Sequence, residues 1–127
     1  MPVGAVVSAV WGLVVLAGLS VVMARAVHSE GLDRNGLMGV RTKATVHCDE
    51  CWRLAHRAAE PGLRRASWAA AVAAVVCVVL AAVSSGRSWG EAVTVTALGV
   101  SYAAVVAVLL HAAVVAGRAA RALHPRR

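Results

Sequence analysis

The sequence has 127 residues, enough for one domain, and 60% of them are hydrophobic, well above the share usual in soluble globular domains. The excess is alanine and valine, and the charges are confined to a few stretches instead of wetting one face of every element. A net charge of +7 is compatible with nucleic-acid binding, but the basic residues flank apolar segments, as in membrane proteins. We therefore predict a single membrane domain over residues 1–127, surrounded by the lipid bilayer, with no nucleic-acid partner and no cofactor.

Three apolar segments are long enough to cross a membrane. The first, 3–24, is an uncharged run of 22 residues, which is about 33 Å of helix. Because no Lys or Arg precedes it, we expect a retained helix and not a signal peptide. The second and third are 66–85 and 92–117. Backbone groups in lipid must satisfy one another's hydrogen bonds, so these segments predict an all-α integral membrane fold of three transmembrane helices.

The distribution of basic residues sets the expected orientation. Twelve of the 13 Lys and Arg residues lie in the segment 25–65 or after residue 117, whereas the turn 84–91 carries only Arg87. Basic loops remain in the cytoplasm. We therefore expect a multi-pass protein of the cell membrane with a cytoplasmic loop 25–65, a cytoplasmic C-terminus and an N-terminus outside.

The loop 25–65 divides into an irregular part and a short helix. Glycines interrupt the segment 29–44. Thr45 is typical of an N-cap, and the Pro-Gly pair at 61–62 is typical of a helix end. These features predict a helix from Val46 to about Ala59, whose basic residues suit anionic lipid headgroups. We expect it to lie along the membrane surface as an interfacial helix.

Several residues of this loop form a pattern with fixed spacing. The pattern spans 23 residues and contains Asn35, Gly39-Val-Arg41-Thr42, Thr45, Trp52 and His56-Arg57. It resembles the pattern of the SdpI family of small bacterial membrane proteins, and the chain resembles the C-terminal portion of the longer founding member. Where the family often has Pro-Trp after Arg-Thr, this chain has Lys43-Ala44. The resemblance implies immunity to a secreted toxic peptide and signalling by binding a repressor at the membrane.

The pattern residues also have physical roles of their own. Gly39 allows a positive φ or a close approach to a helix. Arg41 presents a planar fork of donors that suits a lipid phosphate, a peptide carboxylate or a helix-end carbonyl. Trp52 and His56, four residues apart, share one helical face. Packing of the loop against the helices is the competing interpretation. The candidate ligand-binding residues are Asn35, Gly39, Arg41, Thr42, Thr45, Trp52, His56 and Arg57.

Cys48 and Cys51 have the C-x-x-C spacing. In a reducing cytoplasm we expect thiols or a metal site here in preference to a disulfide. His47 and His56 lie nearby in the sequence and complete a candidate set of zinc ligands. A lone C-x-x-C is a weak indication of metal, so we predict none.

Two further functions are open from the sequence. A small membrane enzyme acting on a lipid or a membrane-bound peptide could use an arginine with His28, His56 and His111. No nucleophile–base pair, P-loop or paired-carboxylate motif supports it, and a hydrogen bond from His111 to a neighbouring helix is the simpler interpretation. A transporter would require a homo-oligomer, for which one helical face offers small residues. These are Gly99, Ala103 and Ala107. The predicted function is protection against a membrane-active peptide, or binding of a cytoplasmic repressor, through the loop.

The orientation can be tested with topology reporters. A reporter fused after Arg127 should be active as a cytoplasmic fusion, and one inserted between Ser85 and Trp89 should be active as an external one, because basic segments resist translocation. Cysteine accessibility at the same positions provides an independent control. If both positions lie on the same side of the membrane, the three-span topology is wrong.

Overall fold

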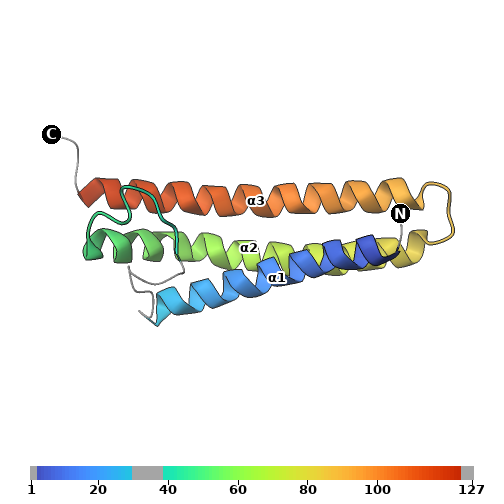
Figure 1. The fold of residues 1–127 in the computed structure, drawn as a ribbon, viewed down its shortest axis with the longest axis horizontal. Helices are drawn as coiled ribbons and strands as arrows, with labels where there is room; N and C mark the ends of the chain where they lie inside the picture. Colours follow the sequence, from blue (N-terminus) through green and yellow to red (C-terminus); the bar gives the residue numbers. More distant parts are fainter. Residues whose placement is uncertain (1–2, 30–38, 124–127) are drawn as a thin grey trace.

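The computed structural model describes residues 3–29 and 39–123, which form three helices: α1 (Val3–His28), α2 (Asp49–Ser84) and α3 (Gly90–Leu123). Figure 1 shows α2 lying between α1 and α3, with α1 starting beside the turn that joins the other two. Each helix is long and apolar enough to cross a membrane. The predicted all-α fold with three membrane-spanning helices is confirmed for the described residues.

Two of the helices are longer than a bilayer requires. α2 has 36 residues and α3 has 34, which correspond to about 54 Å and 51 Å. An apolar core of about 30 Å takes about 20 residues. The surplus turns lie at the same end of the molecule (Figure 1), where the basic residues gather. We call residues 49–65 of α2 and 118–123 of α3 the paired extension.

The predicted interfacial helix over 46–59 is wrong as a separate element. The residues from Asp49 onward are the first turns of α2, and the helix continues through Pro61 into the apolar segment. A proline inside a helix costs about 3 kcal/mol, because its N–H is missing and its ring crowds the preceding turn. Pro61 is exposed and Gly62 beside it faces α3, so packing against α3 holds the helix together here.

Small side chains let α2 and α3 approach closely at the basic end. The contact consists of Cys51, Ala55 and Ala59 of α2 and Ala112, Ala116 and Ala120 of α3. None of these six is more than 2% exposed. A Cβ added at Gly62 would lie 2.6 Å from the Ala112 Cβ, so this glycine sets how closely the helices approach. Residues 49–65 of α2 are therefore held closely against α3 by small side chains, although they precede the apolar segment of α2.

The apolar half of the molecule holds α1 in place. Leu13 of α1 is fully buried against Ala70 and Cys77 of α2 and Val105 of α3. Tyr102 of α3 donates a hydrogen bond from its hydroxyl to the Ala9 carbonyl of α1 at 2.6 Å. This bond satisfies the phenol within lipid, where an unpaired hydroxyl would be costly. α1 is thereby tied to both other helices.

Candidate functional site

The N-cap of α2 lies three residues after the predicted one. Cys48 is the N-cap, and its Sγ accepts a hydrogen bond from the Cys51 N–H at 3.0 Å. Asp49 and Glu50 occupy the first turn, where carboxylates suit the positive end of the helix dipole. The prediction of Thr45 as N-cap is therefore wrong.

Thr45 instead closes a tight turn in the segment before α2. It is fully buried, and its hydroxyl donates to the Val40 carbonyl at 2.8 Å while accepting from the Thr42 N–H at 2.8 Å. The Val46 N–H closes the same turn by donating to the Thr42 carbonyl at 3.1 Å. We call residues 39–48 the docked loop. One hydroxyl thus forms hydrogen bonds with two backbone groups that lie outside any helix or strand and would otherwise lack a partner there.

His56 joins the docked loop to α2. Its Nε2 accepts a hydrogen bond from the Val40 N–H at 2.9 Å, and its Nδ1–H donates to the Trp52 carbonyl at 2.8 Å. The side chain is 2% exposed. The pair of bonds requires the neutral ring with its proton on Nδ1. Burial lowers the pKa of His56 below its ordinary value of 6.5, and the hydrogen bond to Trp52 opposes part of this shift.

Trp52 forms the centre of the site. Its ring lies 4.1 Å from the His56 ring, centroid to centroid, so the predicted shared helical face is confirmed. Trp52 is only 2% exposed. The Arg41 guanidinium carbon lies 6.0 Å from the Trp52 ring centroid, within cation–π range, and the Arg41 side chain is exposed. Arg41 is therefore held over a buried aromatic ring while its donors face outward.

Gly39 begins the described part of the loop with a φ of +132°, one of the two roles expected for this glycine. A Cβ at this position would lie 2.5 Å from Trp52 Cη2 and 2.7 Å from His56 Nε2. The backbone approaches the two rings so closely that only glycine fits.

The three other candidate residues differ from one another in what the structure shows. Thr42 lies within the docked loop, whereas Arg57 is exposed on α2 beside His56. Asn35 falls outside the described residues. The structure thus brings together Gly39, Arg41, Thr42, Thr45, Trp52 and His56. Val40 was not predicted from the sequence. It contributes only its backbone N–H and carbonyl, and every residue type except proline has both groups.

The two cysteines of the C-x-x-C pair are joined. Cys48 and Cys51 form a disulfide, so the expectation of free thiols or a metal site is wrong. A disulfide sulfur does not provide the thiolate that zinc requires. His47 is exposed, and His56 uses both ring nitrogens on backbone groups. Among the described residues, no group of three His, Cys, Asp or Glu side chains could hold a metal ion.

His28 and His111 have surroundings different from those of His56. His111 is exposed on α3, and His28 lines a cavity between α1 and α2. A site shared by His28, His56 and His111 is therefore not supported, because both ring nitrogens of His56 are bonded to backbone groups. The face of small residues considered for oligomers is exposed on α3, and an oligomer stays a prediction. That face contains Gly99, Ala103 and Ala107.

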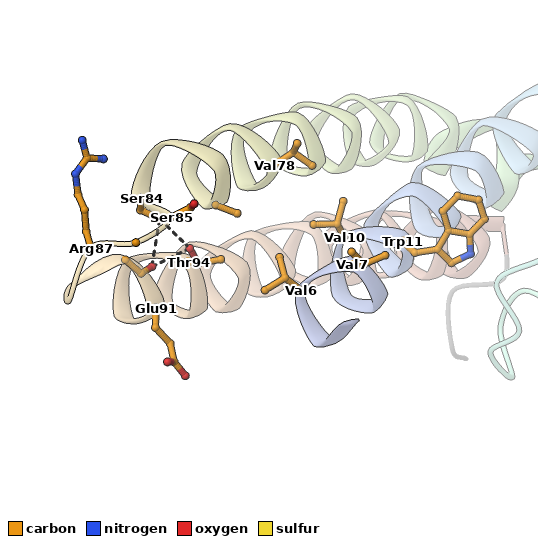
Figure 2. Close-up of a pocket in the computed structure, with 13 residues that line it drawn as sticks. Val6, Val7, Val10, Trp11, Val78, Ser84, Ser85, Arg87, Glu91 and Thr94 are labelled. Atoms are coloured by element: carbon orange, nitrogen blue, oxygen red, sulfur yellow. Dashed lines mark hydrogen bonds between the residues drawn. The ribbon is translucent and has the colours of Figure 1, made fainter. Parts of the chain in front are cut away.

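A cavity of about 680 Å³ opens at the opposite end of the molecule. Figure 2 shows valines and Trp11 of α1 on one side and the turn between α2 and α3 on the other. Thr94 donates to the Gly90 carbonyl at 2.9 Å, and the Ser84 hydroxyl lies 3.4 Å from that of Thr94. Arg87 extends away from the cavity in Figure 2 and lies over the Trp89 ring. The walls of this cavity are mainly apolar, and the hydroxyls of Ser84 and Thr94 are already hydrogen-bonded.

The docked loop, α2 and most of α3 fall within one match to a known family. Residues 32–117 match the SdpI/YfhL protein family. The chain belongs to this family. No curated protein and no solved structure matches the chain significantly. The SdpI family predicted from the loop pattern is confirmed, and with the three apolar helices it makes this chain an SdpI-like multi-pass membrane protein.

The close approach at Gly39 generates a prediction with a matched control. Gly39→Ala should lower the free energy of unfolding by about 3 kcal/mol, because the methyl group adds overpacking against both rings to the strain of a positive φ. Gly86 also has a positive φ of +78°, but nothing lies within 4 Å of its added Cβ. Gly86→Ala should cost only about 1 kcal/mol. Equal losses, measured by denaturant unfolding in detergent, would contradict the steric role of Gly39.

The His56 bonds predict how stability depends on pH. Because burial favours the neutral ring, the unfolded chain binds a proton at pH values where folded His56 remains neutral. The contribution of His56 is therefore complete above its unfolded pKa of 6.5 and declines as the pH falls toward the lowered folded pKa. The decline cannot exceed about 1.4 kcal/mol per pH unit.

The measurement compares the wild type with His56→Gln, which does not titrate, between about pH 5 and pH 8. The difference in unfolding free energy between them should be largest at the alkaline end and shrink below pH 6.5. The other histidines cancel in this difference. A difference that stays constant with pH would show that His56 does not have to be neutral.

Proposed function

We propose that this protein protects a membrane against a membrane-active peptide by binding the peptide at the docked loop. Membership of the SdpI/YfhL family is the first support, since the family pattern implies immunity to a secreted toxic peptide. The second support is Arg41. It is the pattern residue whose charged group is exposed while its position is held by buried neighbours.

The buried pattern residues have a scaffolding role in this proposal. Gly39, Thr45, Trp52 and His56 use their contacts to hold the loop on α2. They do not contact the ligand themselves, and they affect binding by fixing the conformation of the loop. Arg41 is preorganised by that scaffold, which lowers the entropy cost of binding a carboxylate or a backbone carbonyl.

The surface around Arg41 combines positive charge with apolar area. Lys43 of the docked loop is exposed, and Val46 of the same loop is 39% exposed. A peptide with an acidic or carboxylate group beside apolar side chains complements such a surface. The basic charge supports a cytoplasmic location for this end of the molecule, with the N-terminus outside. A cytoplasmic repressor is the other partner that could use this surface.

The alternative of a membrane enzyme finds less support in the geometry. A general base needs a ring nitrogen within reach of its substrate. His56, the candidate for that role, is 2% exposed and has both nitrogens bonded to backbone groups. We therefore favour binding over catalysis.

The role of Arg41 can be tested by changing its geometry while keeping its charge. Arg41→Lys should reduce protection nearly as much as Arg41→Ala, because a lysine cannot donate two parallel hydrogen bonds. Losing a charge-assisted bidentate contact should weaken binding about tenfold or more. The measurement is survival of a toxin-sensitive bacterium that expresses each variant and is challenged with a panel of membrane-active peptides.

Arg118→Ala is the control, since Arg118 is an exposed basic residue on α3, outside the docked loop and the surface that the proposal uses. It should retain protection at equal membrane expression. Full protection by Arg41→Lys would show that charge alone suffices. Unchanged killing by every peptide in cells that express the wild type would count against immunity, and capture of a transcriptional repressor by the wild type but not by Arg41→Ala would favour signalling.

A further inference from the structure

A second cavity lies between α1 and α2, on the other side of α2 from α3. Its volume is about 630 Å³. It is lined by Val21, Ala24, Arg25 and His28 of α1 and by Glu60, Arg64, Ser67 and Trp68 of α2. These residues belong neither to the docked loop nor to the contact between α2 and α3, so the site is distinct from the one proposed above.

The charged groups of this cavity favour an anion. Arg25 and Arg64 carry positive charge, and Glu60 is the acid in the lining. Glu60 Oε1 lies 3.6 Å from Arg64 Nη1, but the Arg64 side chain is 70% exposed. Such an exposed ion pair contributes little to stability, so Arg64 can exchange Glu60 for another anion at small cost. His28 adds a ring N–H donor at the end of α1.

The cavity lies at the level where lipid headgroups are expected. Arg25 follows the uncharged run of α1, and Arg64 immediately precedes the apolar part of α2. Trp68 is 72% exposed at this boundary, a position in which indole rings sit among headgroups. Toward the membrane interior the lining changes to Val21 and Ala24, which are apolar. A molecule with a negative head and an apolar tail matches this order.

We propose that this cavity binds the headgroup phosphate of an anionic phospholipid. Arg25 and Arg64 contact the phosphate from two different helices, so the lipid also bridges α1 to α2 at the basic end. His28 and the Trp68 indole donate to the headgroup oxygens, and the first part of one acyl chain lies along Val21 and Ala24. The Ser67 hydroxyl takes no part, because it already donates to the Arg64 carbonyl at 3.1 Å.

The test uses the full chain purified in detergent, with native mass spectrometry to quantify bound phosphatidylglycerol and phosphatidylcholine of identical acyl chains. The wild type should prefer phosphatidylglycerol. The double variant Arg25→Gln/Arg64→Gln should bind it at least about tenfold more weakly, since each basic residue near a phosphate contributes appreciably. Arg118→Gln/Arg121→Gln removes the same charge from exposed positions on α3 and should retain the preference. Equal losses in both double variants would overturn the proposal.

Glu60→Gln gives a test of opposite sign that does not depend on how well the double variant folds. Removing the carboxylate beside Arg64 should tighten phosphatidylglycerol binding, because no acid then competes with the phosphate. Unchanged or weaker binding would overturn a phosphate at Arg64. Millimolar inorganic phosphate, added as a competitor, should leave the lipid bound because it lacks the apolar part of the ligand. Displacement by phosphate would show an anion site without lipid selectivity and would overturn the lipid proposal.

Discussion

The two hydrogen bonds of His56 hold the functional part of this molecule together. One ring nitrogen accepts from the Val40 N–H of the docked loop, and the other donates to the Trp52 carbonyl of the same helix. Without this pairing the loop would leave a backbone N–H unsatisfied beside a buried aromatic ring. Gly39 with its positive φ, the turn closed by Thr45, and Arg41 over Trp52 all lie around this pairing.

That arrangement depends on a well-supported helix surface, which the first turns of α2 provide by packing against α3. Trp52 and His56 lie on turns of α2 that continue beyond the apolar span, and α3 supports these turns from the other side. Alanines and Gly62 bring the two helices together closely, which maximises dispersion contacts for a small buried volume. A helix lying on the membrane surface would have no such support, and the loop would have nothing fixed to dock on.

Burial divides the pattern residues of the SdpI/YfhL family into two physical groups. Trp52, His56 and Thr45 are almost inaccessible and satisfy one another or the backbone. Arg41 is exposed, and its guanidinium group lies over the buried Trp52 ring. The spacing of the pattern residues therefore reflects the packing of the buried residues as much as any contact with a partner. The disulfide between Cys48 and Cys51 adds a covalent constraint at the start of α2, next to this scaffold.

The sequence by itself determined the three apolar helices, the family and the cluster of pattern residues, because hydrophobic run length and residue spacing are local properties. Even the positive φ of Gly39 and the shared face of Trp52 and His56 could be predicted, since glycine and a four-residue spacing have direct geometric meaning. The tertiary structure decided the rest. Pro61 does not end a helix, because contact with α3 outweighs its local cost, and Thr45 does not cap one, because its hydroxyl is used by the Val40 carbonyl. Which residues a segment packs against depends on distant parts of the chain, and no local pattern contains that information.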